Sequence, residues 1–257
     1  MIRVLRAVAP ALALVALLGL WEGLCRGLGV LPSILPPPSA IGLALVQHFP
    51  LLMRSAWNTF AMALIALAVA SAVATSLAIG AVLSGVFERS LRPLVVAVQV
   101  TPVVALAPLI QIWAGIDHPG VAEVALAAVV AFFPIYSGAL SGLRAVDPDL
   151  ERLFNLYGAG AWQRLVRLRL PSAVPFLLEG HKVAVGLALV GAVVAEFGAG
   201  AGSASGQGLA WRILEANHKL QTDRAMAALL VLAAMGAALY SLFQGLERRA
   251  LAWWRGR

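Results

Sequence analysis

The sequence predicts an all-α integral membrane protein with six transmembrane helices. Of its 257 residues, 61% are hydrophobic and only 12% are charged, which places the chain outside the composition of ordinary soluble domains. Because about 20 helical residues cross the hydrocarbon core of a bilayer, long uncharged runs mark the crossings. The predicted spans are residues 7–21, 55–87, 93–116, 124–143, 170–196 and 225–246.

The first of these runs, 7–21, is short and follows Arg3 and Arg6, so a cleaved signal peptide is the alternative interpretation. Cleavage needs small residues at the exit of the run. Glu22 and Leu24 stand there instead. We therefore expect a retained helix.

The connections between the first spans have distinct compositions. Residues 32–38 include three consecutive prolines, so they are expected to form an extended external connection, with Ser39 as a cap for a short helix. The second run, 55–87, exceeds one crossing and predicts a helix that tilts or projects beyond the bilayer. After the fifth span, 198–208 interleaves glycine with alanine and serine and is interpreted as a loop.

Polar residues and prolines interrupt the apolar run of the third span. Irregular backbone survives inside a membrane only beside protein or a water-filled cavity, so we interpret this span as a wall of a transport pathway. A kinked packing helix with bonded polar groups is the alternative. Glu196, at the outer end of the fifth span, fits interfacial solvation or a cavity lining. The candidate pathway residues are Gln99, Thr101, Pro102, Gln111 and Glu196.

Two further spans carry features that predict helix contacts. Gly138 and Gly142 form a small-xxx-small pair that allows another helix to approach the fourth span closely. In the fifth span, Glu179 and Lys182 are spaced to pair at i, i+3 near the cytoplasmic end. A pathway role for these charges is the alternative.

A basic amphipathic segment lies between the fourth and fifth spans. Leu150, Leu153, Phe154 and Tyr157 recur at helical spacing and form one apolar stripe. The sequence Gly-Ala-Gly at 158–160 then permits a turn before a second apolar face begins. The pattern predicts two short helices at the membrane surface, where a soluble partner can bind.

The net charge of +7 is distributed asymmetrically between the two predicted sides of the membrane. This asymmetry favours a membrane topology signal over nucleic-acid binding as the explanation of the positive charge. With the N-terminus inside and six spans, thirteen arginines fall on the cytoplasmic side, and Lys182 lies within a span. This bias follows the positive-inside rule and predicts that both termini are cytoplasmic. The opposite side receives only Arg26, Arg54, Arg212, Lys219 and Arg224.

The sequence offers little support for catalysis or for bound cofactors. A phosphate-binding loop needs Gly-Lys followed by Ser or Thr, whereas both lysines follow histidine, so a partner is expected to hydrolyse any ATP. The four histidines lack metal-ligand spacing, and Cys25 is the only cysteine. A membrane enzyme acting on lipid is an alternative that rests on Glu179 and His181, which point apart on a helix.

Four segments, in order and spacing, resemble the permease subunits of binding-protein-dependent ABC importers: TPVVALAPLIQIWAG, LRAVDPDL, YGAGAWQRLVRLRLPSAVP and GLALVGAVVAEF. The resemblance covers nearly the whole chain from about residue 32. The signature glycine and the hydrophobic-x-Leu-Pro ending of the family's loop fall on Gly158, Leu168, Leu170 and Pro171. The Glu-Ala-Ala start of that signature is not matched by residues 152–154.

The resemblance implies a type I ABC importer permease: one transmembrane domain over 1–257, with a core at 55–246 and a cytoplasmic coupling loop at 144–173. It implies a homodimer in the bacterial inner membrane, with two cytoplasmic ATPases that bind the ATP, and an extracytoplasmic substrate-binding protein. The expected ATPase-coupling residues are Phe154, Leu156, Tyr157, Gly158, Ala159, Trp162 and Pro171.

The resemblance also bears on cargo. The chain resembles most the branch that imports nitrate, sulfonates and taurine, or pyrimidine thiamine precursors and riboflavin. Within that branch the loop and the fifth and sixth spans resemble the pyrimidine-precursor and riboflavin members more, so a small planar heterocycle is the expected cargo. Import of sulfonate, taurine or nitrate is the alternative. A passive channel is a further one, but it leaves the amphipathic loop unexplained.

Overall fold

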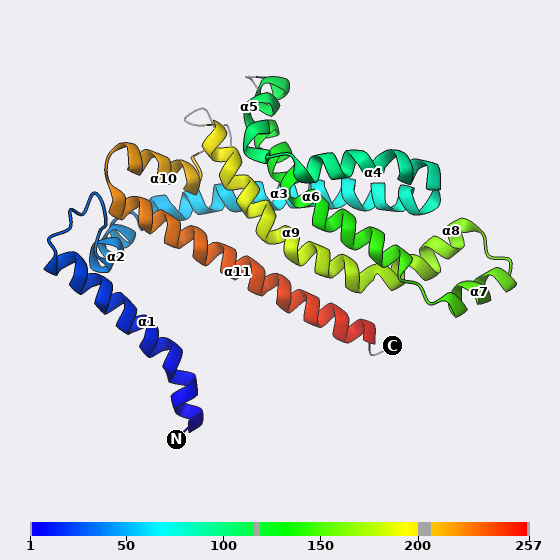
Figure 1. Cartoon of the computed structure of the whole chain (residues 1–257), viewed down its shortest axis with the longest axis horizontal. Coiled ribbons are helices and arrows are strands. Elements are labelled where there is room, and N and C mark those ends of the chain that lie inside the picture. Colours follow the sequence, from blue (N-terminus) through cyan, green and yellow to red (C-terminus); the bar gives the residue numbers. More distant parts are fainter. Residues whose placement is uncertain (1, 116–118, 200–206, 256–257) are drawn as a thin grey trace.

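The computed structural model describes residues 2–115, 119–199 and 207–255, and these parts of the chain are helices joined by short connections (Figure 1). The helices are α1 (Ile2–Gly27), α2 (Pro38–Gln47), α3 (Phe49–Leu83), α4 (Gly85–Val100), α5 (Val103–Ala114), α6 (Pro119–Arg144), α7 (Pro148–Leu156), α8 (Ala161–Arg164), η1 (Leu165–Arg169), α9 (Leu170–Ala199), α10 (Leu209–His218) and α11 (Thr222–Arg255).

Four helices of the described chain are long and apolar enough to cross a membrane. They are α3, α6, the continuous helix Ala161–Gly198, and α11. The consecutive helices α4 and α5 meet the same criterion together, which makes five spans if the bent pair is one crossing. The first predicted span lies within α1. The all-α membrane fold is confirmed, and six crossings stays a prediction.

The centre of the molecule is built from α3, α6 and α9, which approach one another through small residues. In α3, Ala66, Ala70, Ala74 and Ala78 repeat every fourth residue and are buried. On α6, a methyl group at Gly138 would lie 2.7 Å from the backbone oxygen of Phe176. The backbones of α6 and α9 therefore touch, as the small-xxx-small spacing predicted.

The third predicted span is broken rather than kinked, which corrects the expectation of one helix over 93–116. The chain bends by 108° between α4 and α5. Thr101 has extended backbone (φ −73°, ψ 128°) because the ring of Pro102 disfavours helical geometry in the residue before it. Pro93 and Pro108 lie inside helices and do not cause the break.

The second predicted span was wrong at both ends. Its helix, α3, has 35 residues and begins at Phe49, and it ends at Leu83 rather than continuing to Phe87. Ser84 has extended backbone, and its hydroxyl accepts a hydrogen bond from the Phe87 amide, so it caps a new helix, α4. A hydropathy profile does not reveal this turn.

The predicted cap at Ser39 is also corrected, because Pro37 is the N-cap residue of α2. Ser39 instead binds the carboxylate of Glu22 from α1. Its amide and its hydroxyl donate to the two carboxylate oxygens at 3.0 and 2.7 Å. The residues between the two helices, 28–37, form the non-helical connection that the prolines predicted.

The helix that follows the Gly158 turn does not start at a proline. It runs without interruption from α8 through the π-helical turn η1 into α9. In η1 the amide of Leu170 bonds the carbonyl of Leu165, one residue further back than in an α-helix. Such a turn eases the presence of Pro171, whose ring would crowd the carbonyl four residues earlier. The surface segment and the membrane helix are therefore one element.

The helix α10 was not predicted. The interpretation of 198–208 as a loop applies to residues that mostly lie outside the described ranges. Beyond them, Gly208 has extended backbone and caps α10, whose ten residues are too few and too mixed in polarity to stand out in a hydropathy profile. In Figure 1, α10 lies beside the start of α11, at the end of the molecule opposite α7.

Candidate functional site

The surface segment between α6 and α9 is a helical hairpin made of α7 and α8 (Figure 1). The side chain of Asp147 accepts a hydrogen bond from the Asp149 amide and caps α7, with Pro148 in the first turn. At the other end, Gly158 has φ +67° and reverses the chain. Its position in the left-handed region explains why glycine stands there.

The predicted coupling residues lie on this hairpin, except Pro171, which lies in the first turn of α9, and most of them are exposed. Leu156, Tyr157 and Trp162 are 85%, 83% and 71% exposed, which is unusual for large apolar side chains in a structured segment. Phe154 and Ala159 are half-buried. A cavity of about 420 Å³ separates the two arms of the hairpin and is lined by Leu153, Phe154, Tyr157, Ala159, Gln163 and Arg167.

Two polar contacts join the arms of the hairpin, and two leucines are buried at its junction with the membrane helices. Arg169 donates to Glu151 at 2.6 Å, and Arg164 donates to Asn155 at 2.7 Å, so each joins α7 to the second arm. Leu165 and Leu168 in η1 are buried. Since η1 continues into α9, the hairpin and the membrane helix are mechanically linked.

The pathway candidates on the broken span do not converge on one site. Gln99 lines a cavity of about 240 Å³ between α4 and α6, together with Arg92, Tyr136 and Arg144. The hydroxyl of Thr101 bonds the backbone of α4, and Pro102 caps α5. On α5, the Gln111 side chain lies near Gly198, at the C-terminal end of α9.

Glu196 is fully buried and joins three helices, which the sequence did not predict. The Thr59 hydroxyl of α3 donates to one carboxylate oxygen at 2.6 Å, and the Ala210 amide of α10 donates to the other at 2.9 Å. The Leu209 amide donates to the Thr59 oxygen. The carboxylate thus binds the amino end of α10, where a negative group is stabilised.

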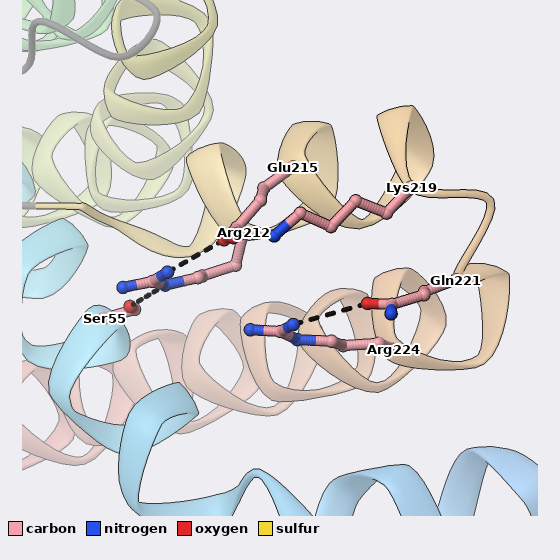
Figure 2. A network of polar contacts seen from close by, with 6 residues as sticks. All are labelled: Ser55, Arg212, Glu215, Lys219, Gln221 and Arg224. Atoms are coloured by element: carbon pink, nitrogen blue, oxygen red, sulfur yellow. Dashed lines mark hydrogen bonds and ion pairs between the residues drawn. The ribbon is translucent and has the colours of Figure 1, made fainter.

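A third cavity, of about 310 Å³, lies near the N-terminal end of α3 beside the start of α10. Sequence reasoning missed it because its residues come from segments about 150 positions apart. The Arg212 guanidinium, seen between Ser55 and Glu215 in Figure 2, forms one side. The lining residues are Leu51, Arg54, Ser55, Asn58, Gln207 and Arg212.

The charged residues of α9 form contacts with its neighbours. Lys182 pairs with Glu179 at 3.2 Å, as the i, i+3 spacing predicted, and with Glu247 of α11 at 3.3 Å. His181 bonds Ser71 of α3 at 2.7 Å and stacks on Phe243 of α11. Glu179 and His181 therefore engage different partners in the described part of the chain.

These features define a class of protein: a multi-spanning helical membrane protein with polar cavities near both ends and an exposed helical hairpin joined to a membrane helix. A family model described as "Binding-protein-dependent transport system inner membrane component" matches residues 70–251. The chain belongs to this family of ABC importer permeases and is a transporter subunit.

Individual relatives agree with this assignment. The chain is 30% identical over 254 residues to the formylaminopyrimidine transport permease protein ThiX of Halalkalibacterium halodurans, with 96% of each chain covered. It is 33% identical over 175 residues to the putative aliphatic sulfonates transport permease protein SsuC of Bacillus subtilis, covering 67% of this chain and 61% of that one.

The fold is also similar to a solved structure, described as an amino acid ABC transporter with histidines. The TM-score is 0.63 at 16% sequence identity, and the match covers 80% of this chain and 97% of the other. At this identity the similarity concerns the fold alone.

Proposed function

We propose that this chain forms the membrane pathway of an importer and that the α7–α8 hairpin couples the pathway to ATP hydrolysis by partner ATPases. The observation that carries the proposal is the exposed apolar surface at Leu156, Tyr157 and Trp162, on a hairpin whose second arm is continuous with α9. Exposed aromatic side chains of this size are typical of protein interfaces.

The coupling route that we propose is rigid. A partner that moves the hairpin moves α9 with it, because η1 and α9 form one helix and the Arg169–Glu151 pair joins α7 to that helix. At the far end of α9, Glu196 contacts the start of α10. Motion on the cytoplasmic side is therefore transmitted to the outer end as a rigid-body shift.

The proposed assembly contains two copies of this chain, two ATPases and an extracytoplasmic binding protein that delivers cargo. The proposed cargo is a small heterocycle, in agreement with the name of the formylaminopyrimidine permease. Sulfonate import is the second candidate, because the sulfonate permease is of comparable identity.

Reconstitution tests this proposal. The chain and its partner ATPase are placed in proteoliposomes, the partner binding protein is added outside, and uptake of labelled compounds is measured with and without ATP inside. We expect ATP-dependent uptake of a pyrimidine or flavin that the binding protein also binds. A binding protein that bound taurine or nitrate and ignored pyrimidines and flavins would contradict the heterocycle. Uptake independent of ATP would contradict the coupling.

A further inference from the structure

The outer cavity between α3 and α10 is lined by hydrogen-bond donors. Each polar side chain of its lining carries at least one donor: Arg54, Ser55, Asn58, Gln207 and Arg212. No carboxylate belongs to this lining in the described part of the chain. We infer that the cavity is a subsite for an anionic group of the cargo, such as a sulfonate, carboxylate or phosphate.

Arg212 is held in place to receive such a group. Its Nε donates to the Ser55 hydroxyl at 3.1 Å, and its Nη1 donates to Glu215 at 2.8 Å (Figure 2). Its side chain is only 12% exposed. The two bonds fix the plane of the guanidinium, and Nη2 is the donor that we assign to the ligand. A pre-oriented guanidinium loses little entropy on binding an oxyanion.

The charges around the cavity are not balanced. One carboxylate, that of Glu215, is shared between Arg212 and Lys219, whose ammonium donates to its other oxygen at 2.7 Å (Figure 2). Arg54 of α3 adds an exposed cation to the lining. With the buried Glu196 one helical turn deeper, two carboxylates face the three cations Arg54, Arg212 and Lys219, and the remaining positive charge attracts an anion to the cavity.

The shape of the cavity favours a small anion over the acidic surface of a protein. Ser55 is buried, and the side chain of Arg212, which donates to it, is only 12% exposed, whereas a docking surface presents its charges to solvent. Away from bulk water, a charge-assisted hydrogen bond is stronger than on the surface. One helical turn deeper, Thr59 binds the buried carboxylate of Glu196, which marks the inner limit of the anion subsite.

This inference rests on the proposed import function, because it treats the cavity as part of the inward route. It concerns the charge of the cargo and leaves open whether the cargo is a heterocycle or an aliphatic molecule. It narrows the pyrimidines and flavins proposed above to those that carry an acidic group, and it excludes uncharged ones. A short aliphatic sulfonate meets the requirement as well.

Direct binding tests the subsite. The full chain is placed in phosphatidylcholine nanodiscs at fixed low ionic strength, and methanesulfonate is titrated by calorimetry. Methanesulfonamide, which has nearly the same shape and no charge, is the matched ligand. We expect methanesulfonate to bind at least about tenfold more tightly, as for a charge-assisted bond. Equal affinity for the two compounds would overturn the inference.

Three variants locate the binding. Arg54→Gln removes an exposed cation from the lining, and Asn58→Asp places a carboxylate there with almost no change of shape. We expect each to weaken methanesulfonate binding at least about tenfold. Arg26→Gln removes one charge from the same predicted side but outside the cavity, and it should change the affinity less than about twofold. An equal loss in Arg26→Gln would mean diffuse attraction and no site.

Two further measurements distinguish a cargo subsite from a lipid site and from a docking surface. In nanodiscs that contain phosphatidylglycerol, affinity within about twofold supports a cargo subsite, whereas strong competition would assign the cavity to a lipid headgroup. If methanesulfonate did not bind while Arg54→Gln weakened docking of the binding protein, the cavity would be a docking surface and the inference would be wrong.

These measurements use no ATP. Binding of methanesulfonate without ATP-driven uptake would therefore contradict the proposed function and leave the subsite intact.

Discussion

Gly208 shows how one residue without a side chain holds three helices together. A methyl group added there would overlap the carboxyl group of Glu196, which binds Thr59 and the amide of Ala210. We predict that Gly208→Ala displaces this carboxyl group and destabilises the protein by about 1–3 kcal/mol, because buried polar groups lose their partners. Thermal unfolding in detergent measures the loss.

Gly186→Ala is the matched control. Gly186 lies on the same helix as Glu196, and a methyl group there meets no atom within 4 Å. Because alanine loses less backbone entropy than glycine in a helix, the variant should be neutral or more stable by roughly 0.5–1 kcal/mol. A Gly208→Ala protein as stable as the Gly186→Ala protein would show that Glu196 does not need its observed position.

Glu215, in α10, makes the stability of the protein depend on pH. The hydrogen bond from Lys219, with a further one from Arg212, holds the pKa of the Glu215 carboxyl below its ordinary value. A lowered folded-state pKa means that the carboxylate stabilises the fold fully above the ordinary glutamate value of about 4.3 and loses this effect as the pH falls through the folded value.

We predict that the difference in unfolding temperature between the native protein and Glu215→Gln is largest near neutral pH. It should shrink below about pH 4 as the native carboxylate takes up a proton. Subtracting the two curves cancels the acid sensitivity of all other groups. A difference that stayed constant to about pH 3 would rule out a charge contribution from this residue.

At the scale of elements, the turn between α7 and α8 is the part of the coupling proposal that one substitution tests best. Gly158 has φ +67°, and a methyl group there would meet no atom within 4 Å, so Gly158→Trp strains the turn and adds bulk to the exposed face. We predict normal membrane insertion and a drop of at least about tenfold in ATP-driven uptake, as for loss of an interface hot spot. Copurification of the ATPase reports docking directly.

Gly85→Trp is the control for bulk on the same predicted side of the membrane. Gly85 starts α4, and the nearest atom to an added carbon is a terminal nitrogen of Arg89 at 4.0 Å. This variant should retain uptake. If Gly158→Trp assembled with the ATPase and transported at the normal rate, the hairpin would not be the coupling surface.

At the scale of the whole molecule, the distribution of arginine predicts the topology. Reporter fusions after Asp147 and at Arg257 should give cytoplasmic signals, and a fusion at Lys219 should give an external one. The prediction requires α7 and α10 to face opposite sides of the membrane, and Figure 1 shows them at opposite ends of the molecule. A cytoplasmic signal at Lys219 would exclude the six-span arrangement.

The membrane class, the helical content, the amphipathic hairpin and the close approach at Gly138 and Gly142 all followed from the sequence. Each of them depends on local quantities: hydropathy over one helix, the spacing of residues on one face, or a turn that needs glycine. The Glu179–Lys182 pair is of the same kind, because both residues lie on one helix. Such features are independent of how the helices are later arranged.

Only the tertiary structure decided where the helices break and which polar groups meet. The turn at Ser84 leaves the hydropathy of the chain nearly unchanged. A proline can either kink a helix, as we expected for 93–116, or break it, as at Thr101–Pro102. The packing of the neighbouring helices decides between the two. Glu196 meets Thr59 from 137 positions away, and Arg212 meets Ser55 from 157. Helical periodicity describes one helix at a time, so contacts between distant helices, and the cavity that they line, appear only when the helices pack.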